Sequence, residues 1–146
     1  MLAYDADLEL FRDNFKRFMK EHVAPFYEQW EREGLYPRSL WNQLGENGFL
    51  CVDVPEEYGG YGVPTHYSLM LVEESARAGY SAISTGISCH SEIAAPYILH
   101  IASEEQKQYW LPKMVSGEVV GAIGMTEPGA GSDLQAMRIS AILQGD

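Results

Sequence analysis

Residues 125–133 read MTEPGAGSD, and this loop is the most informative stretch of the chain. The run VVGAIGM at 119–125 precedes it and predicts a strand, because β-branched residues alternate there with small ones. A second strand is expected over 136–143, where apolar residues recur at period two. The loop glycines can take positive φ or let a ligand approach the backbone, and the hydroxyls of Thr126 and Ser132 can donate and accept hydrogen bonds. The stretch therefore favours a binding loop for a flat ligand with polar edges.

The wider stretch at 122–135, AIGMTEPGAGSDLQ, resembles a signature of the acyl-CoA dehydrogenase family of flavoproteins, and it looks most like the long-chain members. Upstream, SEEQK at 103–107, LPKM at 111–114 and the pair Gly59-Gly60 are also similar to the family's amino-terminal part. The resemblance covers nearly the whole chain. It implies a helical bundle that leads into a β-domain, which family members continue into a carboxy-terminal helical bundle.

The composition is typical of a soluble globular protein with one core. Of the 146 residues, 46% are hydrophobic, and the mean hydropathy is −0.20. No apolar run approaches the ~18–20 residues that span a bilayer, and the first residues lack the features of a secretory signal. Cys51 and Cys89 are far apart, without the paired spacing of a metal or redox site, so we expect a reducing compartment and no metal.

The chain is strongly acidic. Its 21 acidic and 10 basic residues give a formal net charge of −11, which argues against a nucleic acid as partner. Coenzyme A and a flavin dinucleotide are anionic as well, so the cations that neutralise their phosphates must be local or lie in other sequence. A cluster of four basic residues falls on one predicted helical face, and we interpret it as a solvated face that balances nearby acidic residues. These residues are Arg12, Lys16, Arg17 and Lys20.

Hydrophobic periodicity predicts a mostly α chain with five helices. The first spans 5–33 and is kinked by Pro25, which cannot donate to the carbonyl four residues earlier. The other helices are expected from Pro37 to Gly48, over 65–78, over 81–102 with a bend at Pro96, and from a capping box at Ser103 and Gln106 to Gly117.

The chain divides into two parts. Residues 1–117 are expected to form an amino-terminal helical domain, a five-helix bundle of the acyl-CoA dehydrogenase type, and 118–146 the start of an incomplete β-domain that carries the flavin loop. A sheet of two strands is marginal alone, so we expect the chain to be an amino-terminal fragment of a longer protein. The side chains expected in the core of the bundle are Phe11, Phe15, Phe18, Leu44, Leu69 and Val72.

The resemblance implies FAD contacts in the loop and in the strand before it. Thr126 would lie against the pyrimidine side of the isoalloxazine ring, where hydrogen bonds near N1 and O2 stabilise the charge of the reduced flavin. The alternative is that its hydroxyl only caps a strand end. Ile123 and Met125 would offer backbone contacts to the ring edge. Gly131 and Ser132 would lie near the flavin pyrophosphate and the thioester-bearing part of the substrate.

Two loop carboxylates, Glu127 and Asp133, have the residue types of an acid–base pair. We favour a structural role instead, in which they bond to backbone amides and hold the loop. The run HSE at 90–92 is not interpreted as a catalytic cluster, because adjacent residues on a helix point in different directions. The resemblance implies that the catalytic base lies beyond Asp146, so no catalytic residue is assigned.

The helix expected at 81–102 carries unusually small side chains. By resemblance, its first turns would line the cavity for the acyl tail, and short side chains would admit a longer tail. The residues expected to face the substrate are Thr85, Gly86, Cys89, His90 and Ile93. Tight helix–helix packing also selects small residues. The two interpretations carry equal weight.

The resemblance implies an FAD-dependent dehydrogenation of fatty acyl-CoA thioesters to trans-2-enoyl-CoA in β-oxidation. A glutamate base would remove the α-proton, the β-hydride would pass to flavin, and electrons would leave to an electron-transfer flavoprotein. A homotetramer is implied, cytoplasmic in a bacterium or in the mitochondrial matrix of a eukaryote. Two alternatives remain: a relative that uses oxygen, such as an acyl-CoA oxidase or a flavin monooxygenase, and a non-catalytic helical interaction module.

Overall fold

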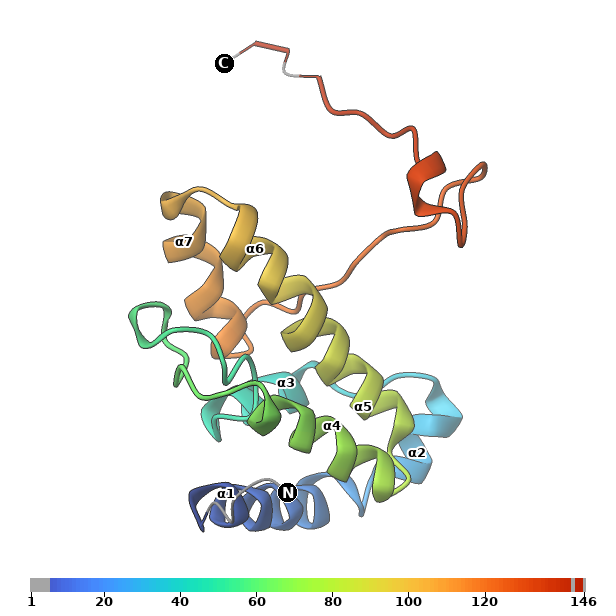
Figure 1. Ribbon diagram of the computed structural model, residues 1–146. Coiled ribbons are helices and arrows are strands. Elements are labelled where there is room, and N and C mark those ends of the chain that lie inside the picture. Colours follow the sequence, from blue (N-terminus) through green and yellow to red (C-terminus); the bar gives the residue numbers. More distant parts are fainter. Residues whose placement is uncertain (1–5, 143, 146) are drawn as a thin grey trace.

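The expected mostly α fold is confirmed by the computed structural model, which describes residues 6–142 and 144–145 (Figure 1). Two kinds of short turn accompany the α-helices: η1 and η3 are π-helical, and η2 and η4 are 3₁₀ turns. In chain order the elements are α1 (Ala6–Phe18), η1 (Met19–Val23), α2 (Tyr27–Glu33), α3 (Arg38–Glu46), η2 (Glu56–Tyr58), α4 (His66–Arg77), α5 (Ser81–Ile87), η3 (Ser88–Ala94), α6 (Ala95–Ile101), α7 (Glu104–Val115) and η4 (Leu134–Ala136).

The helix expected over 5–33 is broken rather than kinked, and residue 5 lies outside the described residues. At the end of η1 the N–H of Ala24 donates to the carbonyl of Met19, five residues earlier, at 2.9 Å. Pro25 follows without an N–H to continue the ladder. The chain therefore turns before α2 begins at Tyr27.

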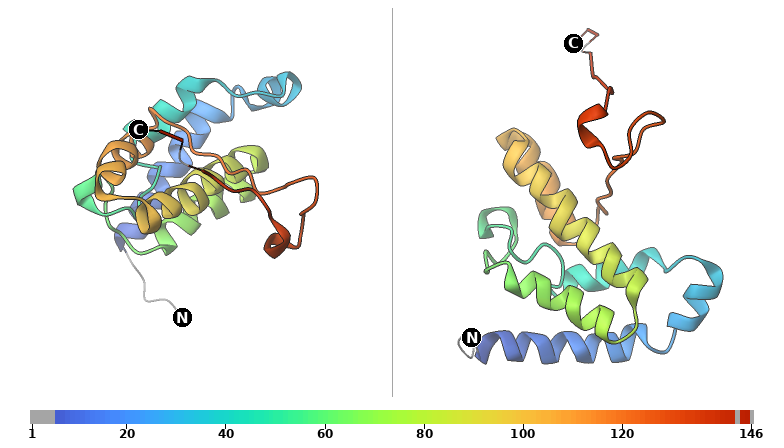
Figure 2. Two further views of the ribbon diagram at one scale, coloured as in Figure 1. Left: turned by 90° about the horizontal axis from the view of Figure 1, so that it is seen from above. Right: turned by 45° about the vertical axis from the view of Figure 1, so that its right-hand side comes forward.

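The helix expected over 81–102 is a rod of three parts, α5, η3 and α6, that run on from one another (Figures 1 and 2). The N–H of Ala95 donates to the carbonyl of His90, five residues earlier, which is the π pattern. Pro96 follows directly, where a residue without N–H costs least because the ladder is already shifted. Both long helices are thus subdivided, and the expected set of five helices is not what the structure shows.

The helices pack in sequence along this rod. α4 contacts both α1 and α5, and α7 folds back on α6 (Figures 1 and 2). The capping box at the start of α7 forms as expected: the N–H of Gln106 donates to the hydroxyl of Ser103, and the N–H of Ser103 donates to the Gln106 side chain at 3.0 Å. The start of α7 is therefore set by local sequence.

The main core is centred on Phe49, directly after α3. Its N–H donates to the carbonyl of Leu44 at 2.8 Å, and its ring meets those of Phe15 and Phe18 edge-on, with centroids 5.0 and 5.3 Å apart. Such ring pairs contribute about 0.5–1.5 kcal/mol beyond the area that they bury. The expected burial of Phe15, Phe18 and Leu44 is confirmed, and Phe11 is partly buried against the same core.

The buried face of α4 differs from the expected one. Leu69 is 55% exposed, so its predicted burial is wrong, whereas Val72 is partly buried against the core. The face turned inward carries Ser68, Leu71 and Ser75. The buried hydroxyl of Ser75 donates to the carbonyl of Leu71 at 2.7 Å, which satisfies a polar group that periodicity alone places outside.

The strands expected at 119–125 and 136–143 do not form within the described residues, and residue 143 lies outside them. The described backbone shows there an isolated bridge between Glu127 and Ala130. A strand needs a neighbouring backbone to take up its N–H and C=O groups. No neighbouring strand lies beside 119–125 or 136–142 in the described part of this chain. The segment after α7 leaves the helices as an extended stretch of chain without a paired backbone (Figure 1).

The turn at 115–118 sets the direction of that departure. Gly117 has a φ of +72°, and a Cβ atom there would lie 2.1 Å from the carbonyl oxygen of Trp41. Arg38 of α3 donates from Nη2 to the carbonyl of Gly117 at 2.6 Å and also to that of Glu118. The turn therefore depends on both a left-handed residue and a close backbone contact with α3.

We expect Gly117→Ala to lower the free energy of unfolding by about 2–4 kcal/mol, because it combines left-handed strain with a clash against backbone. Gly34→Ala is the matched control: its φ is +69°, and nothing lies within 4 Å of an added Cβ. It should cost only about 1 kcal/mol. Urea unfolding of both variants measures the difference, and equal losses would contradict the contact with Trp41.

Candidate functional site

An apolar cavity of about 520 Å³ lies between the end of the rod, α7 and the segment that follows α7. Apolar side chains dominate its wall, and residues 121–125 line one part of it. The lining residues are Ala94, Tyr97, Ile98, Trp110, Met114, Val119, Gly121, Ala122, Ile123, Gly124, Met125, Leu134 and Met137. The cavity thus includes two of the predicted flavin contacts, Ile123 and Met125.

His90 connects this segment to the helices. Its side chain is fully buried, Nδ1 lies 2.9 Å from the N–H nitrogen of Gly121, and Nε2 lies 3.0 Å from the carbonyl oxygen of Met114. Burial lowers the pKa of His90, with the bond to Met114 acting in the opposite sense and Arg38 lowering it further. The arrangement therefore holds a neutral imidazole at the start of the cavity wall.

The loop at 125–133 is closed by its own backbone and by one carboxylate. Glu127 and Ala130 exchange N–H···O=C bonds of 3.0 and 3.1 Å. The carboxylate of Glu127 accepts from the N–H groups of Arg138 and Ile139 at 2.9 and 3.0 Å. The predicted loop-holding role of Glu127 is confirmed. The carboxylate of Asp133 has no such bond among the described residues, so the prediction holds for one carboxylate of the two.

The polar groups predicted to meet the flavin face outward. Thr126, Gly131 and Ser132 are exposed, and no protein atom described lies within 4 Å of a Cβ built at Gly129 or Gly131. Neither glycine takes a positive φ, so neither is demanded by the local backbone. The loop offers hydroxyls and unobstructed peptide groups beside an apolar cavity. That combination fits a ligand with a flat apolar ring system and polar edges.

The predicted tail contacts lie on the rod outside this cavity, and His90 is buried with its ring nitrogens bonded to Met114 and Gly121. Thr85 is exposed, Cys89 is half-buried, and neither is among the described residues that line the 520 Å³ cavity. Between them, a Cβ on Gly86 would lie 2.5 Å from the hydroxyl oxygen of Tyr36 and 3.5 Å from the ring of Trp41. Small residues here let α5 approach the aromatic side chains beside α3, which supports the packing interpretation.

The residues at 90–92 have separate partners, as expected for neighbours on a helix. The buried hydroxyl of Ser91 accepts from the N–H of Cys51 at 3.0 Å, and Ser68 donates to the carboxylate of Glu92. Burial raises the pKa of the Cys51 thiol to about 12 and that of Glu92 to about 7. These side chains form structural bonds to different elements, and Cys51 is not a thiolate nucleophile at neutral pH.

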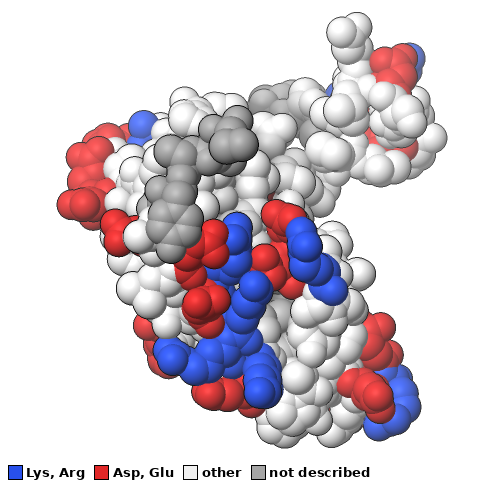
Figure 3. Space-filling model, turned by 60° about the horizontal axis from the view of Figure 1, so that its bottom comes forward, with Lys and Arg blue, Asp and Glu red and all other residues white. Residues whose placement is uncertain are grey.

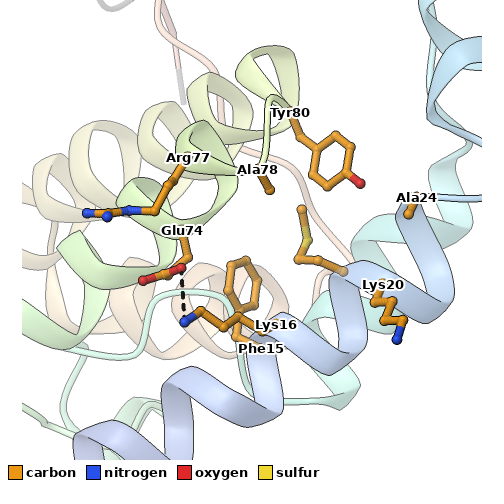
Figure 4. A pocket seen from close by; sticks show the side chains of 9 residues that line it. Phe15, Lys16, Lys20, Ala24, Glu74, Arg77, Ala78 and Tyr80 are labelled. Atoms are coloured by element: carbon orange, nitrogen blue, oxygen red, sulfur yellow. Dashed lines mark ion pairs between the residues drawn. The ribbon is translucent and has the colours of Figure 1, made fainter.

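The basic face of α1 is charge-compensated (Figure 3). Glu74 of α4 lies 3.4 Å from Arg12 Nε and 3.5 Å from Lys16 Nζ, and Arg12 also pairs with Glu9. Beside these pairs is a smaller cavity of about 330 Å³, with Phe15 and Tyr80 in its wall (Figure 4). The ion pairs of Arg12 and Lys16 agree with the prediction of a balanced, solvated face, whereas Arg17 donates to the neutral side chain of Asn14 at 2.9 Å.

Neither a metal site nor a membrane-spanning helix is found in the described residues. They contain no group of three or more His, Cys, Asp or Glu side chains placed to hold a metal ion. No helix within 6–142 is long and apolar enough to cross a membrane.

Comparison with known proteins identifies one family. Residues 5–118 match the model of the acyl-CoA dehydrogenase N-terminal domain. The mitochondrial long-chain specific acyl-CoA dehydrogenase of Sus scrofa is 38% identical over 142 residues, which are 97% of this chain and 33% of that protein. The structure of an acyl-CoA dehydrogenase from Geobacillus kaustophilus has a TM-score of 0.84 at 47% identity and covers 91% of this chain and 34% of its own.

A glutaryl-CoA dehydrogenase from Mycobacterium smegmatis, solved in complex with FADH2, has a TM-score of 0.85 at 28% identity over 92% of this chain and 34% of its own. The present chain thus spans about a third of the length of the relatives that it matches.

We expect Glu127→Ala to speed amide exchange at Arg138 and Ile139 by about 10-fold or more, because bonds to a charged acceptor contribute about 1.5–3 kcal/mol. Glu127→Gln keeps one acceptor oxygen and should have a smaller effect. Asp133→Asn is the control, since the described residues give its carboxylate no backbone bond. Hydrogen exchange read by mass spectrometry over 134–142 makes the comparison. Equal exchange in all three variants would remove Glu127 as the anchor.

Proposed function

The chain belongs to the acyl-CoA dehydrogenase family, and from this premise we propose that it is the amino-terminal part of an FAD-dependent dehydrogenase of fatty acyl-CoA thioesters. The intact enzyme would convert its substrate to the trans-2-enoyl thioester in fatty acid β-oxidation. The observation that carries the proposal is the exposed hydroxyl- and amide-bearing loop beside the 520 Å³ apolar cavity. A flavin needs both an apolar surface for its ring and hydrogen-bond donors for its polar edge.

The loop residues fit FAD. Ile123 and Met125 would present backbone to the ring edge, while Thr126 would donate near N1 and O2. Gly131 and Ser132 would lie near the pyrophosphate, where small residues and amide donors suit anionic oxygen. The bound cofactor would supply the hydride acceptor. This chain's own residues would bind and orient it and keep water from one side of the ring through the apolar wall of α6 and α7.

The proposed substrate contacts have less structural support than the proposed flavin contacts. Ser132 would lie near the thioester, and Thr85 and Cys89 would face the acyl tail if the rod borders its cavity. The contact of Gly86 with Tyr36 and Trp41 supports packing as the first reason for the small side chains. We assign no catalytic residue here and propose that the glutamate base is supplied by sequence beyond Asp146.

The proposed organisation places a helical domain at 1–117 and the start of a β-domain at 118–146. The segments at 119–125 and 136–143 would become strands when the rest of the β-domain provides their partners. The enzyme would pass electrons to an electron-transfer flavoprotein and assemble as a homotetramer. It would work in the bacterial cytoplasm or in the mitochondrial matrix.

Absorbance of the intact purified protein tests the function. We expect an oxidised flavin spectrum that bleaches without oxygen on addition of an acyl-CoA, examined with butanoyl-, octanoyl- and hexadecanoyl-CoA. The 146-residue chain alone should give no turnover with a dye acceptor, because the base is missing. An intact protein without flavin would overturn the proposal in favour of a helical interaction module. Rapid reoxidation by oxygen would instead favour an oxidase.

Thr126→Val in the intact protein should weaken flavin binding by about 2- to 10-fold or lower the flavin reduction potential, because it removes a hydrogen bond worth ~0.5–1.5 kcal/mol. Thr126→Ser retains the hydroxyl and is the matched control. Flavin dissociation constants and reduction potentials of both variants distinguish the roles. If Val and Ser variants both match the parent, Thr126 only ends the preceding segment.

A further inference from the structure

We propose that His90 is a positioning residue: as a neutral imidazole whose other nitrogen is held by the end of α7, it anchors the backbone at Gly121, in the segment with predicted flavin contacts, to the rod. The inference rests on the proposed function for its consequence at the flavin. It stands on the geometry of one side chain that bonds to two positions 24 and 31 residues away in sequence.

The hydrogen bonds of His90 determine its tautomer. The N–H of Gly121 can only donate, so Nδ1, 2.9 Å away, must be the acceptor. In a neutral ring the proton then resides on Nε2, which donates to the carbonyl of Met114 at 3.0 Å. Both ring nitrogens are used. The bond from Gly121 requires an unprotonated Nδ1, and the bond to Met114 requires a protonated Nε2.

The ring has no freedom to leave this position. It is fully buried and meets the ring of Trp41 edge-on, with centroids 5.3 Å apart. Gly121 approaches so closely that an added Cβ would lie 2.7 Å from the Cβ of Ala94 and 2.8 Å from Cε of Met114. The segment is therefore pressed against the rod at the one residue that His90 binds.

Protonation would break the bond to Gly121, because Nδ1–H and the amide N–H would then face each other as two donors. The pKa of His90 is lowered by burial, so the neutral form is favoured. Arg38 of α3 is the charged group that acts on it, while Lys113 of α7 lies 4.0 Å from Glu118 and 3.8 Å from the centre of the Tyr109 ring. The stabilising effect is complete above the ordinary pKa of 6.5 and is lost as pH falls through the lower pKa of the folded protein.

Two substitutions separate the two bonds. His90→Asn places an acceptor near the position of Nδ1 and loses the donor to Met114, whereas His90→Gln keeps a donor near Nε2 and loses the acceptor for Gly121. In the intact protein, His90→Gln should raise amide exchange over 119–125 about 10-fold and weaken flavin binding about 2- to 10-fold. His90→Asn should stay within about 3-fold of the parent in both measurements.

Ser75→Ala is the control for general destabilisation, since it removes a buried hydroxyl bond of 2.7 Å within α4. It should leave exchange over 119–125 unchanged. Loss of that protection in Ser75→Ala to the same degree as in His90→Gln would reduce His90 to ordinary core packing and overturn the proposal.

The pH comparison uses the parent protein and the folded His90→Asn variant. Protection factors for 119–125, corrected for intrinsic exchange, should fall in the parent as pH is lowered from 7.5 to 5, and His90→Asn should remove most of that fall. An identical pH profile in both proteins would overturn the role of His90, because Glu92 and other groups titrate equally in both. Exchange does not depend on flavin chemistry. A flavin-free protein with the expected exchange pattern would therefore overturn the proposed function while leaving the anchoring by His90 intact.

Discussion

The segment after α7 leaves the helical layer without entering a sheet, so its buried peptide groups need other partners. Side chains and backbone of the helices provide the partners. The Arg38 guanidinium donates to the carbonyls of residues 117 and 118. The N–H of Val119 donates to the carbonyl of Lys113 at 3.0 Å, and the N–H of Gly121 donates to His90. Three elements, α3, the rod and α7, thus determine where the cavity wall begins. The loop at 125–133 begins four residues after Gly121, the last of these bonded positions.

Local sequence was sufficient where a helix end depends on its own residues. The capping box of Ser103 and the ends of α2 and α3 at Gly34 and Gly48 were all predictable. Prediction failed where distant residues decide. The inward face of α4 carries Ser68, whose hydroxyl donates to the carboxylate of Glu92, 24 residues away, and hydrophobic periodicity does not indicate such an acceptor. The strands failed for a related reason, since a strand is a property of a pair of backbones.

The candidate site divides in the same way. The motif marks the loop, and residue chemistry predicted that its carboxylates bond to backbone amides. Glu127 does so, but its amides are those of Arg138 and Ile139, 11 and 12 residues away, which the sequence did not indicate. The resemblance placed His90 against the acyl tail, and nothing in the sequence indicated its two hydrogen bonds. Its partners are 24 and 31 residues away, and its neighbours Ser91 and Glu92 point to other elements. Only the packing of α7 against the rod brings its two bonds together, so sequence reasoning correctly rejected a local catalytic cluster and missed the longer connection.

In this acidic chain, with its net charge of −11, several basic side chains already have partners within the fold. Arg12 and Lys16 pair with Glu74, Arg77 with Glu73 and Lys113 with Glu118, while Arg38 binds backbone carbonyls. These five cations are committed to bonds within the fold, and no Lys or Arg is among the described residues that line the 520 Å³ cavity. Neutral amide and hydroxyl donors of the loop remain to meet an anionic cofactor there. They orient phosphate oxygens but do not cancel their charge. Under the proposed function, the phosphates of FAD and of the thioester substrate would therefore draw their cations from the remaining two thirds of the protein or from a neighbouring subunit. The helical layer would contribute shape, an apolar wall and a fixed starting point for the loop.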